Sequence, residues 1–146
     1  MATSTMSQIS ARNQISGTVS DIQAGTAMSL VTVQAHGQRI TSAITNQAVQ
    51  ELGLRKNDPV VAFVKSTEAM LVKGDAGAIK ISARNRVSGR VTDIQKGTAM
   101  GSVTVDAGQL KLTSTITRQA IDELQLTQGD QVTAFFKATE VMLQKA

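Results

Sequence analysis

The tetrapeptide Ser-Ala-Arg-Asn stands at residues 10–13 and returns unchanged at residues 82–85. With this offset of 72 positions, residues 10–73 align with residues 82–145 without a gap, and 37 of the 64 aligned positions are identical. The chain is therefore one module of about 70 residues written twice. We predict two domains, at residues 7–73 and 79–145. A residue kept in both copies serves either the fold or a shared site, and its chemistry must decide which.

A module of this size buries a limited fraction of its surface and is only marginally stable alone. The 146 residues include no cysteine and one histidine, so neither a disulfide nor a Cys/His metal site can add stability. We therefore expect the two copies to pack against each other and the chain to form a homo-oligomer.

The charge balance indicates an anionic partner only weakly, because 15 basic residues face 11 acidic ones. The chain has no run of five or six like charges of the kind found in nucleic-acid-binding tails. No stretch reaches the roughly 18 apolar residues that cross a bilayer, and no signal peptide is visible. We expect a cytoplasmic protein that contacts neither nucleic acid nor membrane.

Hydrophobic patterning predicts an all-β module. In the first copy, β-branched and apolar runs predict strands at residues 13–21, 28–35 and 39–44. Thr45 is then a helix N-cap, and helical spacing continues up to Gly53, a natural C-terminal stop. Strands at residues 60–65 and 69–72 follow, with Pro59 at the entry of the first.

Three strands, a short helix and two more strands is the order of an OB-fold. The second copy repeats this order. The predicted fold class is all-β, with two tandem OB-fold barrels, each of five strands with one short helix. The linker at residues 74–78 is short and flexible enough for the barrels to lie side by side.

The sequence argues against an enzyme. It has no thiol, no acid pair kept at catalytic spacing and no nucleotide-binding glycine motif. The lone His36 is replaced by Gly108 in the second copy, so we interpret it as an exposed turn residue. We expect no catalytic residues, no organic cofactor and no direct ligands for a metal cation.

Side chains kept in both copies suit an anion instead. An arginine offers a permanently charged fork of donors, a lysine ends an apolar strand, a threonine starts a helix whose free N–H groups favour negative ligands, and a serine precedes the arginine. These positions are Ser10, Arg12, Thr45 and Lys65, and Ser82, Arg84, Thr117 and Lys137. Each alone could be a cap, a turn residue or a solvated charge. Kept together twice, they favour a donor-only site for a tetrahedral oxyanion.

Ser-Ala-Arg-Asn opening a strand, Gly-Thr-Val at residues 17–19, Ile-Thr before a short helix and Val-Lys-Ser at residues 64–66 resemble a Mop domain of the TOBE (transport-associated OB) group. The resemblance covers residues 10–73 and 82–145. A chain of two such modules resembles the di-domain molbindins, cytoplasmic molybdate-binding proteins. This implies an oligomer of OB barrels that holds molybdate or tungstate at interfaces between modules, for storage and homeostasis of the oxyanion.

The resemblance also implies that the Ser-Ala-Arg-Asn motif of one barrel faces the helix cap of another. It adds Ser66 and the backbone N–H at Ala48 to the first site, and Ala138 and Ala120 to the second. Because Ser66 becomes Ala138, the second copy lacks one hydroxyl and the two site types can differ in affinity. The turns at residues 25–28 and 97–100 are weaker candidates for anions on a threefold axis. The favoured interpretation there is a tight turn with a core methionine.

The sequence thus predicts a homotrimer of two-module chains with six interfacial oxyanion sites. Two alternatives stay open. One is a single-stranded nucleic-acid binder, which would need aromatic stacking platforms. The only aromatic residues are Phe63, Phe135 and Phe136, all in apolar strands, which argues against it. The other is an oxyanion-sensing regulatory module that acts with a partner protein.

Overall fold

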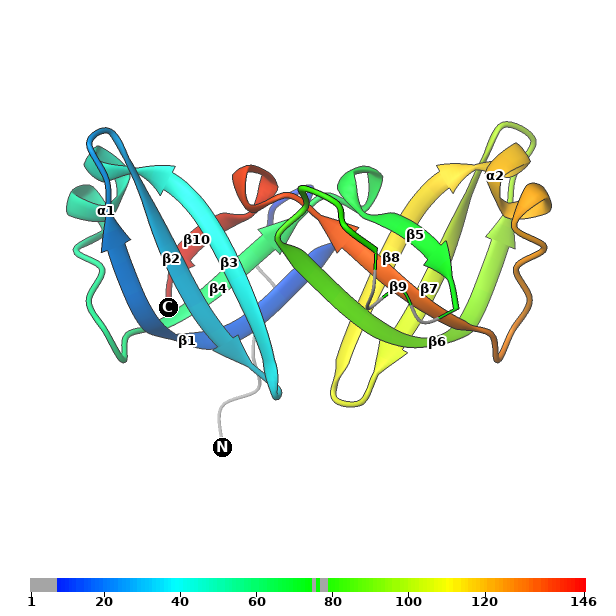
Figure 1. Ribbon diagram of the computed structural model, residues 1–146, viewed down its shortest axis with the longest axis horizontal. Coiled ribbons are helices and arrows are strands. Elements are labelled where there is room, and N and C mark those ends of the chain that lie inside the picture. The colour runs from blue at the N-terminus through cyan, green and yellow to red at the C-terminus, as the bar shows by residue number, and fades with distance from the viewer. Residues whose placement is uncertain (1–7, 75, 77–78) are drawn as a thin grey trace.

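The computed structural model describes residues 8–74, 76 and 79–146. Two curled five-stranded antiparallel sheets lie side by side and are related by approximate two-fold symmetry (Figure 1). This confirms the all-β class and the tandem OB-type arrangement. Three of the five residues of the predicted linker lie outside the described residues.

The elements follow the predicted order. In the first copy they are β1 (Asn13–Ala24), β2 (Met28–Ala35), β3 (Gln38–Thr45), α1 (Asn46–Leu52), β4 (Pro59–Val64), the 3₁₀ turn η1 (Ser66–Glu68) and β5 (Met70–Lys73). In the second copy they are β6 (Asn85–Lys96), β7 (Met100–Ala107), β8 (Leu110–Thr117), α2 (Arg118–Glu123), β9 (Gln131–Phe136), η2 (Ala138–Glu140) and β10 (Met142–Lys145). Among the described residues, no helix is long and apolar enough to span a membrane.

The helix boundaries follow the predicted capping residues. The Oγ1 of Thr45 accepts a hydrogen bond from the backbone N–H of Ala48 at 3.0 Å, as an N-cap does. Gly53 ends α1 in the left-handed conformation, with a φ of 61°, and its N–H bonds back into the last turn. Thr117 caps α2 in the same way.

The fifth strand of each sheet comes from the other copy, which the sequence did not indicate. The sheet orders are β10-β4-β1-β2-β3 and β5-β9-β6-β7-β8. Leu71 of β5 lies opposite Ala134 in β9, and Leu143 of β10 lies opposite Ala62 in β4. The two pairings have the same register because the copies present nearly the same edge strand. Residues 7–73 and 79–145 thus describe the sequence repeat, and each folded half borrows its last strand.

A lysine at the end of each exchanged strand binds polar groups of the half into which the strand is inserted. The Nζ of Lys73 lies 3.4 Å from a carboxylate oxygen of Asp130 and donates to the carbonyl of Gln125, just beyond α2, at 3.0 Å. In the other half, Lys145 pairs with Asp58 at 3.5 Å. Both lysines and both aspartates are identical between the copies, so these identities serve the fold.

Two buried serines also join the halves. The Oγ of Ser42 in β3 donates to the carbonyl of Val141 at 2.6 Å, and Ser114 in β8 donates to the carbonyl of Ala69. Each serine thereby satisfies the backbone just before the exchanged strand. A serine at this position is kept in both copies because each half receives a crossing segment.

The apolar core lies inside the curled sheets and crosses between the halves. One cluster of buried residues includes Val31, Val60 and Ala62 from the first copy and Val87 and Phe136 from the second. All three phenylalanines are buried, as expected from their apolar strands. No aromatic ring is therefore available as a stacking platform for bases.

Gly17 lies where β1 bends, close to the backbone of β2. A Cβ at this position would stand 2.4 Å from the carbonyl oxygen of Gln34, and one at Gly89 would stand 2.4 Å from that of Asp106. A register shift between Val19 and Asp21 follows directly. The glycine therefore permits the close approach that lets the twelve-residue strand curl.

We expect Gly17→Ala to lower the free energy of unfolding by about 1–3 kcal/mol, because the new methyl group forces the backbone of β1 away from β2. Gly89→Ala should have a similar effect. Chemical denaturation measures both. The control is Ser16→Ala on the exposed face of the same strand, for which we expect a change within about 0.5 kcal/mol. Equal effects at positions 16 and 17 would refute this explanation of the glycine.

Candidate anion-binding site

The Ser-Ala-Arg-Asn motif of each copy docks on the third strand of the other half through its asparagine. The side-chain amide of Asn13 donates to the carbonyl of Thr113 at 2.9 Å and accepts from the N–H of Thr113 at 2.7 Å. Asn85 forms the same pair of bonds with Thr41, at 2.9 and 2.7 Å. Both asparagines are buried. Sequence reasoning named the tetrapeptide but missed that its asparagine positions it.

Strand register brings the arginine and the lysine of each copy together. Asn13 in β1 pairs with Val64 in β4. The next residues outward are therefore Arg12 and Lys65, which leave neighbouring strand ends on the same side. The second copy repeats the arrangement with Arg84, Lys137 and the register pair Asn85–Phe136. Two of the predicted site residues thus follow paired strand ends in each copy.

Ser66 begins η1 and lies against β8 of the other half. Its Oγ accepts a hydrogen bond from the Oγ1 of Thr115 at 2.8 Å. In the second copy the equivalent positions hold Ala138 and Ala43, so this hydroxyl pair occurs on one side of the molecule only. The sequence predicted the lost hydroxyl at position 138. Thr115 was missed because it lies in a different element and in the opposite copy.

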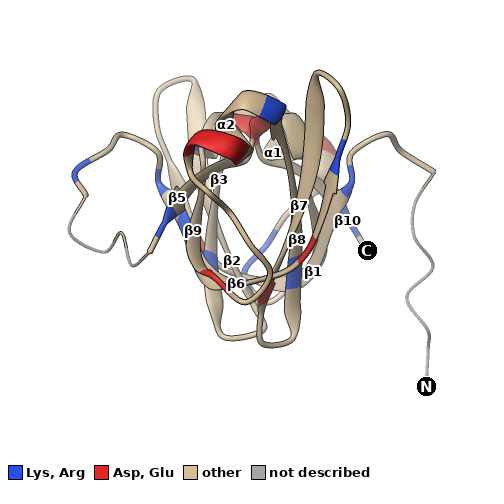
Figure 2. Cartoon of the chain, turned by 90° about the vertical axis from the view of Figure 1, so that its right-hand side faces the viewer, with Lys and Arg blue, Asp and Glu red and all other residues tan. Residues whose placement is uncertain are grey.

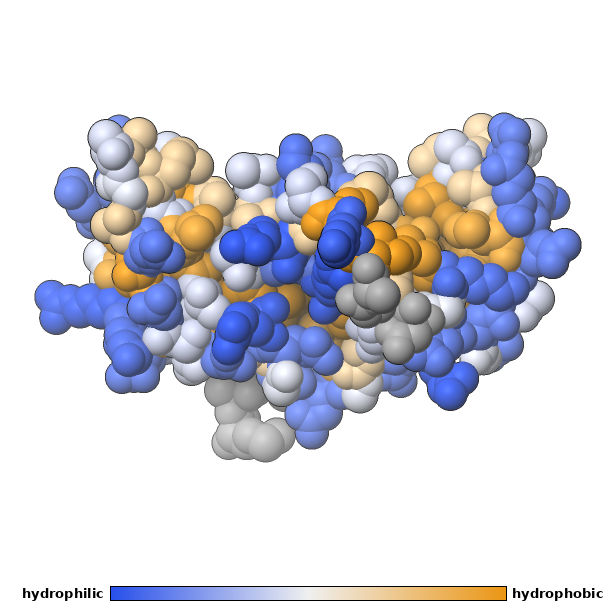
Figure 3. Space-filling view, in the orientation of Figure 1, coloured by the Kyte–Doolittle hydropathy of each residue, from blue (hydrophilic) through white to orange (hydrophobic). Residues whose placement is uncertain are grey.

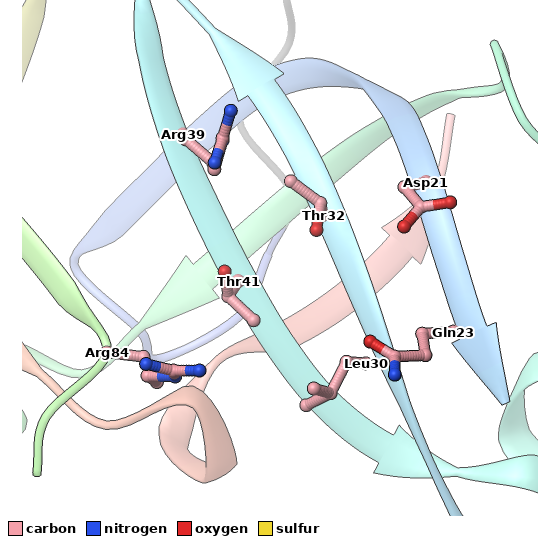
Figure 4. Close-up of a pocket in the computed structure, with 7 residues that line it drawn as sticks. All are labelled: Asp21, Gln23, Leu30, Thr32, Arg39, Thr41 and Arg84. Atoms are coloured by element: carbon pink, nitrogen blue, oxygen red, sulfur yellow. The ribbon is translucent and has the colours of Figure 1, made fainter. Parts of the chain in front are cut away.

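The arginines reach pockets on the outer face of the opposite sheet. A pocket of about 320 Å³ over β1, β2 and β3 is lined by Asp21, Gln23, Leu30, Thr32, Arg39, Thr41 and Arg84. In Figure 4, Arg84 enters it from a segment outside the three strands. A second pocket, of about 260 Å³, is lined by Arg12, Asp93, Gln95, Ser102, Thr104, Thr113 and Thr115. Each pocket contains a carboxylate, so the surroundings of the arginines are not donor-only as the sequence suggested.

Both arginines are exposed, and neither forms an ion pair within the part of the chain that the structure describes. Ser10 and Ser82 are exposed beside them. Among the described residues, no cluster of His, Cys, Asp or Glu side chains could hold a metal ion. Within the described residues the guanidinium groups of both arginines therefore remain accessible and without an acidic partner.

The helix caps lie apart from these motif residues within one chain. Both helices stand at the outer ends of the molecule (Figure 1). The motif of the second copy contacts β3 at Thr41, four residues before Thr45, which is about 13 Å along an extended strand. The N–H of Ala48 already donates to Thr45, and that of Ala120 donates to Thr117 at 3.0 Å. Within the described part of one chain, each cap threonine hydrogen-bonds its own helix, and neither lines the pocket that the arginine enters.

Two carboxyl groups face each other near Lys65. The 3₁₀ turns η1 and η2, which carry Glu68 and Glu140, lie next to each other at the centre of the molecule (Figure 1). Burial, and next the hydrogen bond and charge of Glu140, raise the pKa of Glu68 above its usual value, while Lys65 partly opposes the shift. Both glutamates are kept in the two copies, so the pair forms across the approximate two-fold axis.

We expect Glu68→Gln to stabilise the protein at neutral pH. A raised folded-state pKa means that folding favours the protonated carboxyl. The wild type therefore loses stability, relative to this variant, as the pH rises from about 4.5 through the raised pKa. Thermal unfolding between pH 4 and pH 8 measures the difference. Glu51→Gln, on the exposed surface of α1, serves as the control and should leave the pH profile unchanged. Parallel profiles for wild type and Glu68→Gln would contradict the prediction.

The glycine turns are tight, as predicted, but their methionines are not in the core. The N–H of Gly25 donates to the carbonyl of Met28 at 2.8 Å. Met28 is 43% exposed and Met100 42%, because each is in an outward-facing position at the start of its strand. The prediction of a core methionine was wrong. His36 is exposed in its turn, with a φ of 51°, as expected.

Comparisons with known proteins agree on one family. The model of the TOBE domain matches residues 9–71 and 81–143. The chain is 38% identical over 136 residues to the molybdenum transport protein ModE of Herbaspirillum seropedicae, which covers 92% of this chain and 50% of that protein. It is 34% identical over 135 residues to the molybdenum-pterin-binding protein MopA of Rhodobacter capsulatus, with coverage of 90% and 50%. The chain thus spans about half the length of these curated relatives.

A solved structure is similar over its full length. The cytoplasmic molybdate-binding protein ModG, in a crystal form with molybdate bound, superposes with a TM-score of 0.91 at 32% identity. The match covers 96% of this chain and 100% of that one. The likeness therefore includes both halves and their relative placement.

Proposed function

The chain belongs to the TOBE domain family, and from this membership we propose that it binds molybdate without catalysing a reaction. Each copy would contribute one motif group, which we define as Ser10, Arg12, Lys65 and Ser66 in the first and Ser82, Arg84, Lys137 and Ala138 in the second. The observation that carries the proposal is an exposed arginine, without an ion pair among the described residues, at a strand end that adjoins the strand end of a lysine. The arrangement occurs twice with the same register.

The chemistry of these groups supports an oxyanion ligand. A guanidinium presents parallel N–H donors to two oxygens of a tetrahedral anion, and the lysine adds a compact positive charge. Burial between modules would strengthen each bond by lowering the local dielectric. Tungstate, which has the same charge and shape, is proposed as an equivalent ligand.

We further propose that each site is completed by a helix cap of another chain. Within the described part of one chain, neither Thr45 nor Thr117 lines the pocket that an arginine enters, so a neighbouring chain would bring a cap to each motif group. The backbone N–H groups at Ala48 and Ala120 would have to share their present bonds with the caps. A trimer, with two motif groups on each of three chains, would hold six sites.

Exposed apolar residues support such an oligomer. They recur at equivalent positions of the two copies, which are Ile9 and Ile81, Met28 and Met100, and Met70 and Met142. Figure 3 shows apolar residues at the surface on both sides of the midline. Exposed apolar side chains that gather into a contiguous patch mark interaction surfaces. Ile9 and Ile81 directly precede the motif groups, where the proposed neighbour would contact the chain.

The proposed role is storage and homeostasis of the oxyanion in the cytoplasm. The ModG structure is described as that of a cytoplasmic molybdate-binding protein, which favours this role. ModE is named a transport protein, which keeps open a sensing role with a partner protein. A nucleic-acid role is disfavoured, because the phenylalanines are buried and basic positions are interspersed with acidic ones (Figure 2).

Calorimetric titration of the purified protein with molybdate tests the proposal. Sulfate and a short single-stranded oligonucleotide are titrated in parallel. We expect saturable heat with molybdate, near two ions per chain, and much weaker heat with sulfate. Oligonucleotide binding without molybdate binding would overturn the proposal in favour of the nucleic-acid alternative.

A further inference from the structure

We propose that Thr115 positions Ser66 as a hydrogen-bond donor in the first motif group, so that this group forms the tighter of two classes of oxyanion site. The inference rests on the proposed function and deepens it. Nothing in the sequence repeat assigns Thr115 to the site, because it belongs to β8 of the other copy and its equivalent is Ala43.

The hydroxyl pair directs the Ser66 proton outward. The Oγ1 of Thr115 donates to the Oγ of Ser66 at 2.8 Å. Because the serine oxygen accepts this bond, its own proton is free to be donated to another acceptor. A hydroxyl that accepts one bond is polarised into a stronger donor for the next. Ser66 is therefore prepared to donate to an anion before the anion arrives.

The pair lies beside the arginine of the same motif group. Thr115 lines the pocket that Arg12 enters. Ser66 follows Lys65, which strand register places next to Arg12. Thr115 thus connects Ser66, to which it is hydrogen-bonded, with the pocket of Arg12, which Asp93 also lines.

The second motif group has the same charges but no such pair. Arg84 and Lys137 replace Arg12 and Lys65 with equal charge, and Arg39 and Lys111 occupy equivalent positions on the two sheets. At the remaining positions, Ala138 and Ala43 present only methyl groups. The formal charge is matched, so the groups differ mainly in hydroxyls. Ser66 and Thr115 are replaced by alanines, and Ser102, which lines the pocket of Arg12, is replaced by Leu30 in the pocket of Arg84. A hydrogen bond to a charged ligand changes affinity by about tenfold to a hundredfold, so two classes of site follow.

The variant Thr115→Val tests the inference, because valine keeps the branched shape and removes the hydroxyl. Calorimetric titration of wild type with molybdate should resolve two classes of site. In Thr115→Val the tight class should weaken about tenfold or more, and Thr115→Ser should restore it. Ser66→Ala should weaken the same class, and the double variant should be little worse than either single one, because the two hydroxyls act as a unit. The matched control is Ala43→Val, which adds bulk at the equivalent position and should leave the tight class intact.

Introducing the two hydroxyls into the second motif group should increase its affinity for molybdate. Ala43→Thr combined with Ala138→Ser should raise the affinity of the weaker class toward that of the tight class. If wild type binds molybdate in a single class that Thr115→Val does not change, this inference is overturned while the proposed function stands. If wild type binds no molybdate, both are overturned.

Discussion

Arg12→Ala combined with Arg84→Ala is expected to abolish measurable molybdate binding while leaving the fold intact. Each arginine supplies charge-assisted hydrogen bonds, and losing even one such bond costs about 1.5–3 kcal/mol, which is about tenfold to a hundredfold in affinity. Since an arginine presents several donors, the combined loss at each site should be larger. Calorimetric titration measures the affinity, and circular dichroism checks the fold.

The single variants separate the two sites. Each should remove one class of site and leave the other, so the number of ions bound per chain should fall by half. Arg55→Ala, an exposed arginine in the loop after α1, should leave binding unchanged. Arg12→Lys keeps the charge but loses the planar fork, and we expect an intermediate affinity. Undiminished molybdate binding in the double variant would show that the motif groups do not form the binding site.

Truncation after Val141 should destabilise the first half of the molecule, although the deleted residues belong to the second copy. The deletion removes β10, which pairs with β4 from Met142 opposite Phe63 to Lys145 opposite Val60. The outer edge of β4 then loses its partner and its packing against Leu143. We expect the free energy of unfolding to fall by about 2 kcal/mol or more.

Amide hydrogen exchange locates the effect of this truncation. Protection should be lost in β4 of the first half and retained in β9, which is covered by β5. A loss confined to β9 would mean that each copy keeps its own fifth strand. Lys145→Ala is the control, because it keeps the backbone of β10 and removes only the contacts of the Nζ, an ion pair with Asp58 and a hydrogen bond to the carbonyl of Gly53. It should cost less stability than the truncation.

Local structure could be predicted from the sequence because it depends on nearby residues. The caps at Thr45 and Thr117, the stop at Gly53 and the strands of the first copy all follow from residue type and spacing. The strand exchange could not be predicted, because β5 meets equivalent partners in either half. Leu71 would face Ala62 in its own copy and faces Ala134 in the other, so local pattern does not distinguish them.

The proposed site, too, was predictable where it depends on nearby residues and not where it depends on distant contacts. Arg12 and Lys65 could be named from their retention and chemistry, and register then places them together. The hydrogen bonds of Asn13 and Thr115 at the proposed site could not be predicted, because their partners lie 100 and 49 residues away in the chain. The retained Asn13 and Asn85 were a usable signal, since a buried asparagine needs a partner for both ends of its amide. No comparable signal pointed to Thr115, because Ala43 replaces it.

Native mass spectrometry of the protein with molybdate tests the central claim most directly, because it counts chains and ligands in the same particle. The account predicts particles of three chains that carry up to six molybdate ions, and little molybdate on single chains, since each site needs a cap from a neighbour. Single chains that bind two ions as tightly as the oligomer would contradict the account, because the sites would then be complete within one chain.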